Sequence, residues 1–346
     1  MGPFARKLIV AVVGLGSWVL GPAALGAQAP LPTPSFHHLH LNSVNPEAAI
    51  EFYVKAFPST SKGTFAGQPA LRSPNNVWVL FNKVAAPPAT EPQTAFWHFG
   101  WHVTDVRATL DRYLKQNITL VPLYTGTGEG TGTAFVSSDT YPGTGGVLGL
   151  TRPQIAEAKA KGVKPAGGAG FAYLRGSDDS LVEYQGNMPA ERFNHVHMYQ
   201  EQPFCAQVWY QTHLNVRVPA APASAQASAR QAVVRTEANC RVERGPDRTL
   251  PALDWDGMFR TPAVQTTIFG DVSLYFYMNQ GSTPFGPTRG QLMDHFAVSV
   301  GDLDAWIAKL KAENVTFLEQ LYTVGGLRAV MIEGPSKEAI EIVEVK

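Results

Sequence analysis

The sequence predicts an α+β fold built from four βαβββ units, and repeated segments at both ends of the units support that prediction. Each unit opens with a histidine inside an alternating, strand-like pattern, followed by a turn and a run with helical periodicity. The openings are FHHLHL from Phe36, FWHFGWH from Phe96, FNHVHM from Phe193 and MDHFAV from Met293. The second and fourth units also close on a shared hairpin-like pattern.

The spacing after each opening shows that a pair of units is duplicated. The predicted helices span residues 46–56, 105–115, 203–212 and 302–312. Pro46 and Pro203 each follow their histidine by eight residues, whereas Asp105 and Asp302 follow theirs by seven. Proline suits the first helical position and aspartate suits the N-cap. Units one and three therefore match, as do units two and four.

A residue inside each predicted helix keeps the same phase. The fifteenth residue after His38, His98, His195 and His295 is aromatic or aliphatic in all four cases: Tyr53, Tyr113, Tyr210 and Leu310. This shared offset supports the duplication.

The closing hairpins carry a carboxylate at one position. A turn led by Gly176 or Gly334 is followed seven residues later by Glu183 or Glu341. Both glutamates lie in apolar strand patterns, where an inward-pointing carboxylate needs a partner. Together with the strand histidines they are the candidate functional residues.

The order of the units suggests two domains of consecutive units, residues 36–190 and 193–346. The units are expected at 36–90, 96–188, 193–285 and 292–346. Residues 126–168, with a helical piece at 152–161, and residues 216–240 interrupt the repeat as long insertions. Such insertions are often lids, so we expect at least one to border a site.

Residues 1–29 have the pattern of an export signal. Arg6 and Lys7 precede a 13-residue apolar run at 8–20, and small residues follow at 23–29. A bilayer needs about 20 apolar residues, so cleavage is expected, with an uncleaved anchor as the alternative. The protein is therefore expected to be exported, to the periplasm or the medium. That compartment permits a Cys205–Cys240 bridge, although two free buried thiols fit the sequence equally well.

The composition of the chain limits the classes of binding partner that we expect. The 346 residues contain 28 Lys and Arg against 28 Asp and Glu, so charge gives no reason to expect a nucleic acid or an anionic membrane as partner. The 45% hydrophobic content excludes a disordered chain. A small-molecule substrate is the partner that we expect.

A paired βαβββ unit with a histidine on its first strand and a glutamate on its last resembles the vicinal oxygen chelate superfamily. That superfamily includes glyoxalases, bleomycin and fosfomycin resistance proteins, and extradiol dioxygenases. The resemblance runs from about Phe36 to Val345, and the four-unit layout is most similar to the two-domain dioxygenases. It implies two half-barrel domains with metal ligands on their first and last strands. The implied ligand sets are His195, His295 and Glu341 in one domain, and His38, His98 and Glu183 in the other.

Two imidazoles and one carboxylate suit iron(II), manganese, nickel or zinc and leave positions open for a substrate with two adjacent oxygens. Glu183 and Glu341 are also candidate catalytic bases. Tyr322 is a candidate proton donor, with ordinary strand packing as its alternative.

Two histidine pairs complicate the ligand assignment. His38 and His40, like His195 and His197, are two residues apart and share a strand face. Either member of a pair can be the ligand, with the other orienting it from outside. His37 is expected to point to the opposite face.

The leading hypothesis is a metal-dependent enzyme of the dioxygenase or glyoxalase type. It would act on a small vicinally oxygenated molecule by ring cleavage, isomerisation or lyase chemistry. The alternatives are a non-catalytic, antibiotic-type binding protein and a structural role in which the histidines and glutamates satisfy one another. Metal content separates the first hypothesis from the other two.

Overall fold

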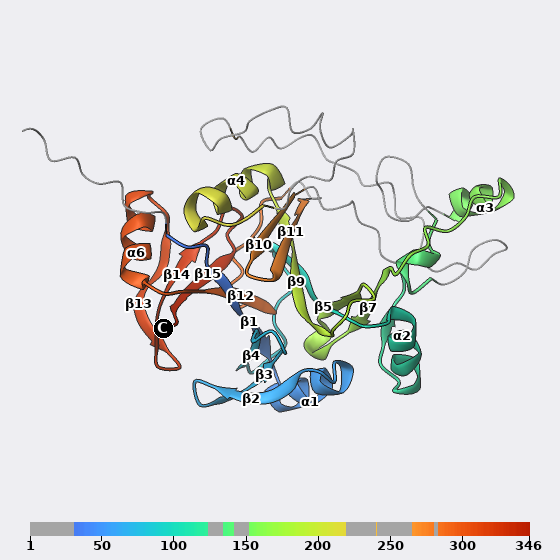
Figure 1. Cartoon of the computed structure of the whole chain (residues 1–346), viewed down its shortest axis with the longest axis horizontal. Coiled ribbons are helices and arrows are strands. Elements are labelled where there is room, and N and C mark those ends of the chain that lie inside the picture. Colours follow the sequence, from blue (N-terminus) through green and yellow to red (C-terminus); the bar gives the residue numbers. More distant parts are fainter. Residues whose placement is uncertain (1–30, 124–133, 142–151, 219–239, 241–264, 280–282) are drawn as a thin grey trace, which may run out of the picture. The chain divides into compact units, whose positions relative to one another are not determined.

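The computed structural model describes residues 31–123, 134–141, 152–218, 240, 265–279 and 283–346, and Figure 1 shows their arrangement. These residues form one eight-stranded and one seven-stranded sheet with helices packed against them. The predicted α+β fold of four units paired into two sheets is confirmed.

The first two units follow the expected order. Unit 1 contains β1 (Ser35–Ser43), α1 (Pro46–Ala56), β2 (Ser61–Phe65), β3 (Gln68–Arg72) and β4 (Trp78–Lys83). Unit 2 contains β5 (Phe96–His102), α2 (Val106–Lys115), β6 (Leu120–Val121), α3 (Arg152–Ala160), β7 (Phe171–Arg175) and β8 (Leu181–Gln185).

The last two units repeat that order. Unit 3 contains β9 (Arg192–Gln200), α4 (Pro203–Leu214), β10 (Gln265–Phe269) and β11 (Val272–Met278). Unit 4 contains β12 (Met293–Val300), α6 (Leu303–Ala312), β13 (Phe317–Val324), β14 (Leu327–Glu333) and β15 (Ala339–Glu344).

The helix boundaries agree with the capping prediction. Pro46 and Pro203 are the first residues of α1 and α4, while Asp105 and Asp302 are the N-caps of α2 and α6. Each aspartate accepts a hydrogen bond from the backbone N–H three residues on, which satisfies one of the free donors at the helix start. The four residues at the shared helix phase are all fully buried: Tyr53, Tyr113, Tyr210 and Leu310.

The units do not pair in the expected way. The strand order β13-β14-β15-β12-β1-β4-β3-β2 joins unit 4 to unit 1, and the order β10-β11-β9-β5-β8-β7-β6 joins unit 3 to unit 2. Antiparallel pairing of β1 with β12, and of β5 with β9, forms the centre of each sheet. The expected pairing of consecutive units within a sheet is therefore wrong, because the repeat defines each unit but not its partner.

Aromatic residues of the central strands connect the two sheets. The Phe36 ring of β1 stacks on Phe193 of β9 and on Phe296 of β12, with centroids 5.6 and 5.7 Å apart. All three belong to one buried core that contains residues of both sheets.

Consecutive units instead meet through helix-to-turn contacts. The Tyr53 hydroxyl of α1 lies 2.7 Å from the Ser180 hydroxyl in the turn before β8. The Tyr210 hydroxyl of α4 donates to the Glu338 carboxyl in the turn before β15, also at 2.7 Å. Burial raises the pKa of Glu338, although its hydrogen bonds oppose that effect. The two contacts occupy equivalent places in the duplicated pair.

Several predictions concern residues outside the described part of the chain. The export signal at 1–29 lies wholly outside it, as does much of the insertions at 126–168 and 216–240.

A disulfide joins Cys205 of α4 to Cys240. Among the described helices, none is long and apolar enough to cross a membrane.

Candidate metal centres

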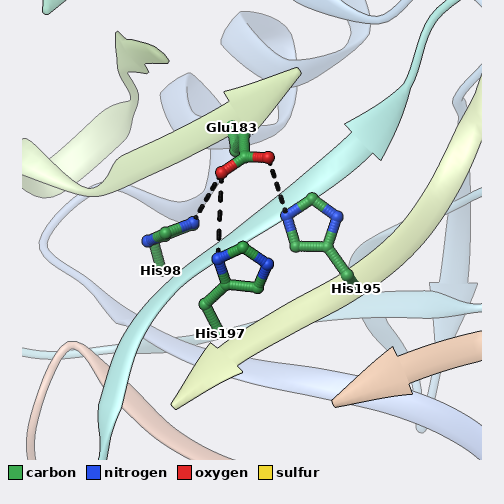
Figure 2. Close-up of side chains that lie close together, drawn as sticks. All are labelled: His98, Glu183, His195 and His197. Atoms are coloured by element: carbon green, nitrogen blue, oxygen red, sulfur yellow. Dashed lines mark hydrogen bonds and ion pairs between the residues drawn. The ribbon is translucent and has the colours of Figure 1, made fainter. Parts of the chain in front are cut away.

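Each sheet brings together three imidazoles and one carboxylate. Site I consists of His98 from β5, Glu183 from β8, and His195 and His197 from β9 (Figure 2). One ligand atom from each of the four lies within 4.8 Å of all the others, and each residue is at most 3% exposed. Four buried donors that converge in this way form a candidate metal centre.

The Glu183 carboxylate is the shared partner in site I. Its Oε2 lies 3.0 Å from Nε2 of His98 and 3.8 Å from Nδ1 of His197. Its Oε1 lies 3.9 Å from Nε2 of His195. Figure 2 shows the three imidazoles directed at the two carboxylate oxygens from two different strands.

Site II has the same composition in the other sheet. It consists of His38 and His40 from β1, His295 from β12, and Glu341 from β15. Ligand atoms of the three histidines lie within 4.8 Å of one another, and Nε2 of His38 lies 3.1 Å from Oε2 of Glu341. The two sites thus repeat one plan.

The contact between His38 and Glu341 tests whether a metal fits. Both atoms are buried and 3.1 Å apart, yet neither has a partner in hydrogen-bonding geometry. Two donors bound to one divalent ion at about 2.0–2.2 Å are separated by roughly 3 Å. The spacing of His38 and Glu341 in site II therefore fits two ligands of one metal ion.

Burial keeps His38 and His40 of site II in the neutral form that binds metals. Burial and the neighbouring His295 lower the pKa of His40 to about 3, and burial also lowers the pKa of His38. Burial would raise the pKa of Glu341, but His38 and His295 outweigh that effect and lower it to about 2. Neutral imidazoles and an ionised carboxylate are the states that metal binding requires.

The structure brings together the glutamate and one histidine of each predicted ligand set. His98 lies with Glu183, and His295 lies with Glu341, as expected. The structure exchanges the other two members: His195 joins site I, while His38 joins site II. Sheet pairing is the reason, since β9 adjoins β5 and β1 adjoins β12.

The second histidine of each pair also faces its site. In the even-numbered units the glutamate lies beside a small residue, Gly100 or Ala297. In the odd-numbered units the corresponding position of the last strand holds Leu80 or Tyr275, beside the second histidines. The odd units thus lack the carboxylate, and His40 and His197 supply a donor there instead. His40 and His197 are therefore candidate ligands. The sequence had left open whether they bind the metal or only orient the other histidine of the pair.

A β-bulge precedes one ligand histidine in every unit: His38, His98, His195 and His295. The register of the central strands shifts so that one residue before each of these histidines has no opposite partner. The extra residues are His37, Trp97, Asn194 and Asp294. A bulge redirects a side chain that would otherwise alternate to the other face.

Three of the bulge residues hydrogen-bond to the following imidazole. The Asp294 carboxylate accepts from Nδ1 of His295 at 2.6 Å, and the Asn194 amide oxygen accepts from Nδ1 of His195 at 2.9 Å. Nδ1 of His37 lies 2.8 Å from Nδ1 of His38, so the expectation that His37 points away is wrong. Sequence reasoning missed these contacts because strict alternation places successive side chains on opposite faces.

Gly100 is a further site residue that the sequence analysis missed. A Cβ atom at this position would lie 2.4 Å from Cε1 of His195 and 2.6 Å from the carbonyl oxygen of Glu183. Only glycine leaves room for that imidazole beside Glu183. The sequence could have indicated this role, because Gly100 lies two residues after His98 and therefore on the same strand face.

The surroundings of the two sites differ. In site II the Tyr322 hydroxyl donates to Oε1 of Glu341 at 2.5 Å, which places this predicted residue at the site. Burial and the charge of Glu341 raise the pKa of Tyr322, so the phenol stays protonated. In site I the rings of Tyr275 and Tyr277 lie 4.9 and 5.2 Å from that of His197.

Comparison with known proteins identifies the fold. No protein-family model matches the sequence, and no curated protein matches it. Glyoxalase I from Zea mays is similar in structure, with a TM-score of 0.54 at 12% identity, over 90% of this chain and 92% of that one. A point mutant of the same maize enzyme gives a TM-score of 0.52 at 12% identity, over 90% and 94%.

The structural comparison and the strand order establish the class of fold. The chain has the vicinal oxygen chelate fold in its four-unit form, as the sequence predicted. At 12% identity the likeness to maize glyoxalase I establishes that fold and no activity. What the chain does has to be argued from its own sites.

Proposed function

We propose that this protein is a metal-dependent enzyme that acts on a small molecule with two adjacent oxygen atoms. The convergence of three imidazoles and one carboxylate in each sheet is the observation that carries the proposal. His98, His195, His197 and Glu183 would hold one ion; His38, His40, His295 and Glu341 would hold the other. Imidazole and carboxylate donors suit iron, manganese, nickel or zinc.

A bound ion would act as a Lewis acid toward a chelating substrate, because four protein donors leave two positions of a six-coordinate ion open. The chain's own residues supply the remaining chemistry. Glu341 is ionised at this centre, and once displaced from the ion it would be free to accept a proton from a substrate held beside it.

Tyr322 supports proton transfer as the reaction type. Its hydroxyl donates to Glu341 Oε1 and thereby fixes the orientation of the carboxylate. A phenol that stays protonated beside a carboxylate can also return a proton to the substrate. Isomerisation or lyase chemistry next to a carbonyl therefore fits site II better than oxidative ring cleavage does.

Metal analysis and a two-arm turnover screen test the proposal. Purified full-length protein should contain or take up two equivalents of a divalent ion, and one equivalent after Glu341→Ala or Glu183→Ala. Small 2-oxoaldehydes and 2-hydroxyketones should incorporate deuterium from D2O in the presence of the enzyme. Catechols with iron(II) in air form the second arm.

The outcomes separate the hypotheses. Protein that takes up no metal would refute the enzyme proposal. Turnover of catechols without deuterium exchange would replace proton transfer by ring cleavage. Two bound ions with no turnover in either arm would favour a binding protein over an enzyme.

Export is part of the same proposal. The sequence of residues 1–29 and the Cys205–Cys240 disulfide both support an oxidising compartment. Expression with a carboxy-terminal tag should yield mature protein outside the cytoplasm that begins after residue 20. Full-length protein retained in the cytoplasm would contradict this.

A further inference from the structure

Each site has one bulge residue whose side-chain oxygen accepts a hydrogen bond from the ligand histidine that follows it. In site II it is Asp294, a carboxylate, before His295, and in site I it is Asn194, a neutral amide, before His195. Both side chains accept a hydrogen bond from Nδ1 of the next histidine. Nε2 of that histidine is then the nitrogen left to face the other donors of its site.

Asp294 is firmly fixed behind His295. Its Oδ2 accepts from the backbone N–H of Gly290 at 2.7 Å and from the Asn42 amide at 3.3 Å, while Nε of Arg289 lies 2.9 Å from Oδ1. The Arg289 side chain is 41% exposed, so solvent screens its charge more than that of the buried Asp294–His295 contact. The carboxylate therefore keeps both its orientation and its influence on the imidazole.

A carboxylate behind a ligating imidazole makes the imidazole a stronger donor, and such outer partners contribute about 10–100-fold to metal affinity. A neutral amide fixes the ring orientation in the same way but adds no negative charge. In site I the Gln185 amide also lies 3.1 Å from Nδ1 of His195, so two neutral amides lie at this nitrogen. The two sites consequently differ in the charge behind one ligand imidazole.

We infer that Asp294 and Asn194 are positioning residues that make the two centres unequal, so that site II holds a divalent ion more tightly than site I. This inference rests on the proposed function, because it presumes that both clusters bind metal. It predicts two separate binding steps for one chain. Asp294→Asn alone or Asn194→Asp alone should bring the steps together, and an exchange of both residues should reverse their order.

Reciprocal substitution tests the inference with Zn²⁺ as the probe. Metal-free, full-length protein is titrated with Zn²⁺ against a chromophoric chelator. Site II is measured alone in a Glu183→Ala background and site I alone in a Glu341→Ala background. Asp294→Asn should weaken site II about 10–100-fold, and Asn194→Asp should strengthen site I by about 10-fold.

Asp304→Asn is the matched control for the loss of one negative charge. Asp304 pairs with Arg328 on the surface, with 72% of its side chain exposed, and it contacts neither site. This variant should leave both affinities unchanged. Thermal unfolding of each metal-free variant shows whether it folds, and Asn194→Asp provides an independent arm if Asp294→Asn does not.

The possible results are distinct. If Zn²⁺ binds both sites but the reciprocal substitutions change neither affinity by more than about twofold, the inference is wrong and the proposed function stands. If Asp304→Asn weakened Zn²⁺ binding as much as Asp294→Asn does, the effect would come from long-range charge, and the inference would also be wrong. If the unsubstituted chain binds no Zn²⁺ and no other divalent ion, the proposed function itself fails.

Discussion

Sites I and II share their donors but not their surroundings. Each has three imidazoles and one carboxylate on the same strands of its units. Tyr322 and Asp294 add a protonated phenol and a carboxylate to site II, whereas aromatic rings and amides surround site I. Duplication thus preserved the residues that face the centre, and the bulges and neighbouring strands differentiated the two copies.

The largest expected effect concerns the space beside His195. Gly100→Ala should displace that imidazole, because the new Cβ would lie 2.4 Å from it. We expect site I to lose its metal, with a destabilisation of about 1–3 kcal/mol from overpacking. Metal stoichiometry and thermal unfolding measure both effects.

Ala297 provides the matched control for Gly100. It occupies the equivalent place beside Glu341 in the other sheet, so Ala297→Gly opens space without a clash. Site II should keep its metal in this variant. Retention of both ions in Gly100→Ala would show that site I adapts, contrary to this account.

The contacts between helices and turns should differ in strength. Tyr210→Phe removes a hydrogen bond to the buried Glu338 carboxyl and should cost about 2 kcal/mol in the free energy of unfolding. Tyr53→Phe removes hydrogen bonding to uncharged partners such as the Ser180 hydroxyl and should cost about 1 kcal/mol. Urea unfolding of the two variants gives the comparison, and equal costs would argue against a special role for Glu338.

A smaller change in stability is expected when a tyrosine hydroxyl beside either centre is removed. Tyr322→Phe removes a 2.5 Å bond to Glu341 and should lower the stability of the metal-free protein by about 1 kcal/mol. Tyr277→Phe removes a long, 3.4 Å contact with His197, and the loss of that contact should cost less than about 0.5 kcal/mol. If Tyr322 moves protons, turnover should fall in Tyr322→Phe while metal affinity is retained.

The sequence predicted the units well because their signals are local. Pro46 and Asp105 are a helix start and an N-cap, as expected, and the residue at the shared offset in helix α1, Tyr53, is buried. The pairings of His98 with Glu183 and of His295 with Glu341 were also predictable, since each pair lies within one unit.

The rest depended on contacts that no local pattern encodes. Nothing in the repeat distinguishes β12 from β5 as the partner of β1, so His38 was assigned to the wrong site. The bulges were missed for a related reason: they arise where two strands meet, and the sequence of one strand does not show them. Asp294 and Asn194 were therefore not recognised, although each immediately precedes a predicted ligand.

The pairing of the first unit with the last has a consequence for the order of folding. In site I, His98 and Glu183 are 85 residues apart, but in site II the contact between His40 and His295 spans 255 residues. Closing the longer loop costs more chain entropy, and contacts of large sequence separation form slowly. The inner sheet of units 2 and 3 can form while the chain is still being made. The outer sheet has to wait for β15, so β1 and β4 spend that interval without the strands that complete their sheet.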